Sequence, residues 1–208
     1  MRSVPQPSGL SFARLRRLNR WQAEGMREDL ADLYVESTST AAGAEYRGRE
    51  DFLTRLAADV RQPGFSMLVA ETTSLAGCVF GFPVGRDGSW WHGFRGPLPQ
   101  NLEQLTASGH VFAITAIVVH PHERNRGLAG RLQERLLGDH HASLGAALLD
   151  EDDHAAYSAF LSWGWQQIGE VHRSPGPAVL RALILALGER TAAVPDGLAH
   201  DARTQRPE

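Results

Sequence analysis

The chain has 208 residues, of which 42% are hydrophobic and 22% are charged, proportions typical of a globular protein that can bury one core. Its formal net charge of −3 gives no general attraction to nucleic acid or to an anionic membrane. All 21 basic residues are arginine, and the absence of lysine excludes chemistry that needs a lysine Schiff base or a phosphate-loop lysine.

The two ends of the chain lack a periodic apolar pattern and contain prolines. We expect residues 1–13 to be a flexible leader, residues 14–188 to form one domain and residues 189–208 to be a flexible tail. No stretch approaches the roughly 18 consecutive apolar residues of a membrane-spanning helix, and the N-terminus has no apolar signal core. We therefore expect a cytoplasmic protein that binds neither membrane nor nucleic acid.

In the first half of the chain the spacing of apolar residues changes once, from a helical pattern to the alternating pattern of strands. Apolar residues recur every three to five positions over residues 14–34 and again over 50–61, which predicts two amphipathic helices. Alternating residues then predict a hairpin of strands over 65–69 and 77–84, in which Cys78 is a buried thiol and not a nucleophile. Residues 85–108 are expected to form a loop with a short helix over 100–105. The aromatic cluster at 90–94 is equally consistent with a pocket lining and with a cap on the core.

The second half alternates strands and helices. The β-branched run over residues 111–119 predicts a strand that is buried on both faces of a sheet. Leucines spaced by four predict a helix over 127–137. The remaining pattern predicts a strand over 144–149, a helix over 154–162, and closing strands over 166–171 and 179–187.

The connector between the central strand and the following helix has the features of an anion site. The first turn of a helix leaves backbone N–H groups unpaired, and glycine and alanine let a ligand approach them closely. An ordinary loop with solvated arginines would carry the same residues. The connector reads His120-Pro121-His122-Glu123-Arg124-Asn125-Arg126-Gly127-Leu128-Ala129-Gly130.

Two segments together resemble the GNAT superfamily of N-acetyltransferases. Val118-Val119-His120-Pro121 followed by Arg124-Asn125-Arg126-Gly127-Leu128-Ala129 is similar to the family's acyl-CoA signature, Arg/Gln-x-x-Gly-x-Gly/Ala. The run from Asp153 to Trp165 is similar to its second block, in which a helix ends with an aromatic residue, three residues and Gly-Phe. The two blocks span roughly residues 111–171.

The resemblance implies an α/β fold: a mixed, mostly antiparallel sheet flanked by helices, with a splayed central strand pair at 111–119 and 144–149. It implies that the domain at 14–188 transfers an acetyl group from acetyl-CoA to a primary amine of a small molecule or peptide by direct attack. The implied reaction needs no metal, and proteins of this family often form homodimers. The implied cofactor-binding residues offer backbone groups to the pantetheine arm (Ile117, Val118, Val119) and to the pyrophosphate (Arg124, Asn125, Arg126, Gly127, Leu128, Ala129, Gly130).

The sequence departs from the family pattern at its general acid. The family often places a tyrosine where this chain has Phe160, and phenylalanine cannot protonate the leaving thiolate. Tyr157 lies one turn earlier on nearly the same helix face and is the candidate catalytic acid, or else a packing residue. His110, Glu103, Glu71 and a water chain stay open as the general base.

Two other functions are consistent with parts of the sequence. The phenylalanine at position 160 would also suit a non-catalytic acyl-CoA-binding module. A nucleic-acid-binding helix face that carries Arg124, Arg126, Arg131 and Arg135 is disfavoured by the net charge.

Overall fold

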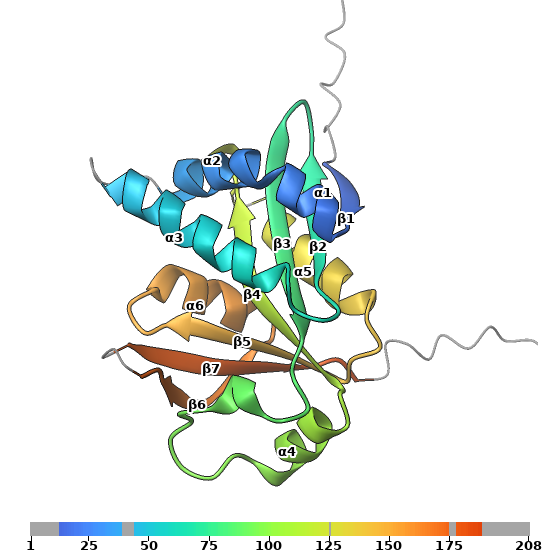
Figure 1. The fold of residues 1–208 in the computed structure, drawn as a ribbon, viewed down its shortest axis with the longest axis vertical. Helices are drawn as coiled ribbons and strands as arrows, with labels where there is room; N and C mark the ends of the chain where they lie inside the picture. The colour runs from blue at the N-terminus through green and yellow to red at the C-terminus, as the bar shows by residue number, and fades with distance from the viewer. Residues whose placement is uncertain (1–12, 39–43, 125, 175–177, 189–208) are drawn as a thin grey trace, which may run out of the picture.

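The computed structural model describes residues 13–38, 44–124, 126–174 and 178–188, with the side chains of residues 44–47 left out. The predicted tail and all of the predicted leader except Ala13 lie outside these residues. The elements are β1 Arg14–Leu18, α1 Arg20–Gly25, α2 Arg27–Thr38, α3 Ala44–Asp59, β2 Ser66–Glu71, β3 Leu75–Pro83, η1 Ser89–Trp91, α4 Gln100–Ala107, β4 Val111–Val119, η2 Pro121–Glu123, α5 Leu128–Gly138, β5 Leu144–Asp150, α6 His154–Ser162, β6 Gln166–His172 and β7 Val179–Ala186 (Figure 1).

The first element corrects the sequence prediction. The single helix expected over residues 14–34 is wrong, because β1 occupies its start and pairs antiparallel with β2. Leu15 and Leu18 show why the pattern misled: they are three apart, as on one helix face, but in the strand they pack into clusters on opposite faces of the sheet. The helices begin only after Asn19, whose side chain accepts a hydrogen bond from the amide of Gln22 in a capping box.

All described strands form one seven-stranded sheet in the order β1-β2-β3-β4-β5-β7-β6. Only the β4–β5 pair is parallel; the other neighbours are antiparallel. This confirms the predicted mixed, mostly antiparallel sheet. The predicted helix over 50–61, the hairpin, and the elements from residue 100 onward are also confirmed, with ends that differ by a few residues.

Helices cover both faces of the sheet. The side chains of α5 and α6 pack into one apolar cluster on the rear face in Figure 1. Helices α1–α3 cover the upper part of the front face, and η1 with α4 covers its lower part. The front face therefore has two separate apolar clusters whose boundary crosses β4 near Thr115.

A β-bulge interrupts β4 at this boundary. The register with β3 shifts between Phe80 and Gly81, so that Phe80 pairs with Ala116 and Gly81 with Ile114, leaving Thr115 as the extra residue. The bulge reverses the phase of the strand. Before it, Ile114 faces the rear cluster, and after it Ile117 and Val119 do.

Candidate active site

The two central strands separate after only four residue pairs. Pairing of β4 with β5 runs from Val111↔Leu144 to Ile114↔Ala147 and then stops, whereas β4 continues on β3 as far as Val119 and β5 continues on β7 as far as Asp150. In Figure 1 the two strands diverge toward their C-terminal ends. The predicted splayed pair is therefore present, and each strand has a free backbone edge facing the gap.

The backbone direction in β4 determines which residues face that gap. The amide of His120 donates to the carbonyl of Ala76 on β3, and the Val118 carbonyl oxygen lies 3.0 Å from where a Cβ on Gly77 would stand. Because backbone groups alternate sides along a strand, Val118 directs its N–H and C=O toward β3. Three residues of β4 were predicted to offer backbone groups to the pantetheine arm. Ile117 and Val119 direct their N–H and C=O groups at the free edge, and Val118 does not.

The start of α5 supplies a second set of backbone donors close to the end of β4. The first intrahelical bond runs from the amide of Arg131 to the carbonyl of Gly127, so the preceding amides of Leu128, Ala129 and Gly130 have no acceptor within the helix. Gly127 is the N-cap and contributes no side-chain hydrogen bond. It has φ +71°, and apart from its chain neighbours no atom of the described residues lies within 4 Å of where its Cβ would stand. The helix start is thus open to a ligand.

The charged residues of this connector make contacts of their own. The guanidinium of Arg124 donates to the carbonyl of Ser37 at the end of α2, and Nη1 of Arg126 lies 3.4 Å from Oε1 of Glu123. Asn125 lies outside the described residues. Backbone amides together with two exposed arginines form a site that suits a diphosphate.

The family's usual acid position is part of the core. Phe160 is 5% exposed, and its ring packs against the rings of Trp163 and Trp165. Tyr157 is half-buried on the same face of the sheet as Ile117 and Val119. The guanidinium of Arg181 on β7 lies 4.3 Å from the centroid of the Tyr157 ring and holds that ring in place. Among the described residues of α6, the Tyr157 hydroxyl is the one acidic group that packs on this face of the sheet.

The three side chains left open as general base do not meet at the gap. Oε1 of Glu71 lies 2.6 Å from Nη2 of Arg16, and this hydrogen bond holds the pKa of Glu71 below its usual value. His110 precedes the paired end of β4, and Glu103 lies on α4. Strands rise about 3.3 Å per residue, so both are far from Val119.

Other sequence predictions also have an outcome. Cys78 is completely buried, and burial raises the pKa of its thiol to about 12, so it is an inert core residue. In the aromatic cluster at 90–94, Trp91 caps the core and donates to the hydroxyl of Thr106 at 3.0 Å, while Trp90 lines a cavity. No cluster of three metal-ligating side chains occurs in the described residues.

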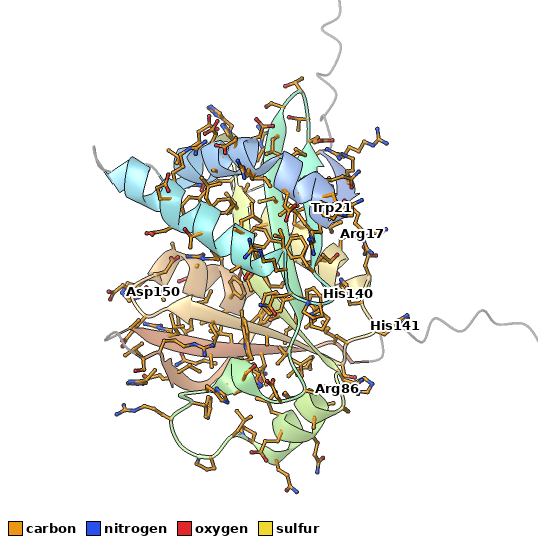
Figure 2. The ribbon with its side chains drawn as sticks, viewed as in Figure 1. Arg17, Trp21, Arg86, His140, His141 and Asp150 are labelled. Atoms are coloured by element: carbon orange, nitrogen blue, oxygen red, sulfur yellow. The ribbon has the colours of Figure 1, made fainter. Side chains whose placement is uncertain are left out.

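A cavity of about 480 Å³ lies behind the sheet, separate from the strand gap. It is lined by α5, Trp163 and the end of β7, and it includes only Gly130 among the predicted site residues. Figure 2 shows His140, which lines it, and Asp150, at the open end of β5, on opposite sides of the molecule. The cavity is therefore not the continuation of the gap.

Sequence reasoning missed one polar residue near the point where the strands separate. Asp59, at the end of α3, is 9% exposed, and its carboxylate has Thr115 as a polar neighbour, whose hydroxyl donates to the carbonyl of Phe80 at 3.3 Å. Its sequence signal was available: Phe52, Leu56 and Asp59 are spaced by four and three, so the acid falls on the apolar stripe of the helix.

A splayed parallel strand pair next to an unpaired helix start is an arrangement that suits an extended arm and a diphosphate. The model of the acetyltransferase (GNAT) family matches residues 23–165, so the chain belongs to this family and is an acetyltransferase. No curated protein sequence matches the chain significantly.

Solved structures share the fold at low sequence identity. An acetyltransferase of the GNAT family from Desulfovibrio desulfuricans has 14% identity and a TM-score of 0.55, covering 84% of this chain and 98% of its own. PaiA N-acetyltransferase from Thermoplasma acidophilum in complex with coenzyme A has 10% identity and a TM-score of 0.54, with the same coverage. A spermidine N-acetyltransferase chimera from Vibrio cholerae and hSSAT has 12% identity and a TM-score of 0.53, covering 85% and 96%. No helix in the described segments has the length and apolar character needed to cross a membrane.

Proposed function

We propose that this protein transfers the acetyl group of acetyl-CoA to a primary amine of a small molecule or peptide by direct attack, without a covalent acyl-enzyme. The observation that carries the proposal is the free edge of β4 beyond Ile114, which ends beside the unpaired amides of α5. This combination offers an extended arm and a diphosphate their hydrogen-bond partners at the same time. Because acetyl-CoA is a metabolite of the cell interior, the proposal includes a cytoplasmic location.

The residues present fit this co-substrate. The amides of Leu128, Ala129 and Gly130 and the charge of Arg124 and Arg126 would hold the pyrophosphate, with Gly127 providing room for it. The amides of Arg124 and Arg126 themselves donate to the carbonyls of Pro121 and Glu123. Ile117 and Val119 would pair with the amides of the pantetheine arm as an added strand. Val118 would contribute through its buried side chain, which anchors the strand in the front cluster.

Acetyl-CoA supplies an activated thioester whose thiolate is a fair leaving group. The chain's task is then to position the amine and stabilise negative charge on the carbonyl oxygen. The proposed donor is the Ile117 amide, which faces the free edge two residues beyond Thr115. Tyr157 is the proposed proton donor to the thiolate. General acids contribute about 10²–10⁴-fold to rate, so proximity alone would leave substantial activity without it.

The proposal is tested by release of free CoA thiol from acetyl-CoA across a panel of primary amines: n-butylamine, spermidine, lysine and an alanyl peptide. Thermal stabilisation by CoA is measured alongside. We expect stabilisation by CoA and amine-dependent thiol release. Stabilisation without release for any amine would instead support an acyl-CoA-binding module, and the absence of both would refute the site itself.

A further inference from the structure

Asp59 is the one charged residue that is buried in the described part of the chain. Its Oδ2 is inaccessible to water and has no hydrogen-bond partner. A buried carboxylate oxygen without a donor is costly, so such groups are rare in folded proteins unless a ligand or a reaction uses them. No described residue donates to this oxygen, which makes it a candidate acceptor for a donor carried by a ligand.

The position of Asp59 on its helix is also unfavourable for stability. It is the last residue of α3, where the helix dipole places partial negative charge and disfavours a carboxylate. It also stands on the stripe formed by Phe52 and Leu56, both of which are buried. An acid that violates two local rules at once indicates a functional role.

The surroundings of Asp59 connect it with the gap between the strands. Thr115 is a polar neighbour of its carboxylate, although the Thr115 hydroxyl donates its hydrogen bond to the carbonyl of Phe80 at 3.3 Å. Thr115 is the bulged residue and the first of β4 beyond the stretch paired with β5. Asp59 belongs to the front layer, since its neighbour Val60 packs in the front cluster, whereas α5 covers the rear face. A thioester arm that is held at α5 and enters the gap would thus bring its acyl end to the front face beside Thr115.

We propose that Asp59 is the residue that receives the acceptor's ammonium group at the point where β4 and β5 separate, and that it takes the proton that must leave before attack. This inference rests on the proposed acetyl transfer. The ammonium gives one proton to the carboxylate, the amine nitrogen forms a bond to the acyl carbon, and the C–S bond breaks. Tyr157 protonates the thiolate, and the second proton that leaves the nitrogen as the amide forms restores the Tyr157 hydroxyl, so that amide, CoA thiol and protonated Asp59 result.

The acidity of Asp59 suits this role. Burial raises the pKa of its carboxyl, while the Thr115 hydroxyl and the charge of Arg55, one turn earlier on α3, act in the opposite direction. A carboxylate with a raised pKa is a stronger base than an exposed one.

The front face also has room for an acceptor. A cavity of about 800 Å³ begins at Gln62, whose amide donates to the carbonyl of Asp59 at 2.9 Å, and it continues along the end of β3 to Trp90. Its charged lining residues are Arg86, Asp87 and Arg173. Sites for small ligands commonly have volumes of about 300–1,000 Å³.

The test compares Asp59→Asn with wild type and with Asp51→Asn, a matched control on the exposed side of the same helix. The amine that wild type uses fastest in the panel above is the acceptor, and kcat, KM for the amine and Kd for CoA are measured from pH 6 to 9. Thermal unfolding of the protein without ligands is measured over pH 3 to 8.

We expect Asp59→Asn to lower kcat/KM for the amine by at least about 100-fold, to leave CoA binding unchanged, and to lose the acidic limb of the pH profile. It should also unfold at a higher temperature than wild type near pH 7, because it removes an unpartnered buried charge. The control should match wild type in every measurement.

An active wild type together with an Asp59→Asn variant within threefold of it would overturn this inference alone. A variant that loses stability and activity in parallel would assign Asp59 a structural role and overturn it as well. A wild type that releases no thiol with any amine would instead refute the proposed acetyl transfer on which the inference rests.

Discussion

Gly127 allows the anion site to be tested apart from the stability of the fold. It has φ +71° and ψ 11° and is the N-cap of α5. Gly88 is its natural control, because it is the N-cap of η1 with φ 73° and ψ 10°. At both positions a Cβ would have no atom within 4 Å, so alanine would introduce backbone strain without a clash.

The stability cost of the two substitutions should be the same. An L-residue in the left-handed region costs about 1–2 kcal/mol, and the lower entropy of the unfolded alanine chain offsets about 0.4–1 kcal/mol of that. Gly127→Ala and Gly88→Ala should therefore each lower the free energy of unfolding by about 1 kcal/mol. In a domain of this size that is a decrease in Tm of about 2–4 °C.

The effect on CoA binding should separate them. A methyl group on Gly127 projects into the open space in front of the α5 amides and would displace one hydrogen bond to the pyrophosphate. Hydrogen bonds to charged groups contribute about 1.5–3 kcal/mol, which corresponds to a Kd for CoA that is about 10- to 150-fold higher. Gly88→Ala should leave Kd within twofold of wild type. Calorimetric titration with CoA measures both values.

Either of two results would refute this reasoning. Equal Kd values for wild type and Gly127→Ala would mean that the pyrophosphate does not lie against this helix start. Equal losses of affinity in both variants would mean that strain weakens binding indirectly, through the fold. Unequal stability losses would show that the two turns differ in ways that their dihedral angles do not capture.

Three further predictions concern single side chains. Tyr157→Phe should lower kcat by about 10²- to 10⁴-fold at saturating substrate with an unchanged Kd for CoA; unaltered turnover across pH would remove Tyr157 from the mechanism. Cys78, with its pKa of about 12, should resist iodoacetamide at pH 8 in the native protein and react once guanidinium unfolds it; rapid native alkylation would contradict the buried placement. Glu71→Gln should leave kcat within twofold and lower the free energy of unfolding at pH 7 by less than about 1 kcal/mol, because the pair with Arg16 is about one-third exposed on both sides. Because Arg16 lowers the pKa of Glu71, this stabilisation is present above the usual carboxyl pKa and should disappear as the pH falls through the lowered one.

The sequence could predict those parts of the site that depend on local pattern. The uninterrupted β-branched run identified β4, and the leucine spacing with Gly127 identified α5. Both predictions succeeded because the hydrophobic pattern within each segment is enough to distinguish a strand from a helix. The splayed strand pair came only from the family resemblance, since nothing within residues 111–119 or 144–149 states which strands pair, or for how long. The first strand was mistaken for a helix because Leu15 and Leu18 are buried on two faces of the sheet.

Two other features depend on contacts distant in sequence. The direction of the Val118 backbone is set by its pairing with β3 and by the bulge, so the three strand residues could not be told apart beforehand. The surroundings of Asp59 include Thr115, which is 56 residues later in the chain. The sequence showed only an acidic residue on the apolar face of a helix. Such a residue is more often a structural residue at the edge of that face than a functional one, so the pattern alone did not identify a site.

The bulge at Thr115 connects the three features on which the proposed chemistry depends. One extra residue bends β4 at the position where its pairing with β5 ends, which favours the opening of the gap. The same residue shifts the strand phase by one, so that Ile117 and Val119 present their backbone to the gap in place of Ala116 and Val118. It also brings a hydroxyl against the buried carboxylate of Asp59. The slot for the thioester, the donors that line it and the acid beside it therefore have a common structural origin, and a change at Thr115 would disturb all of them together.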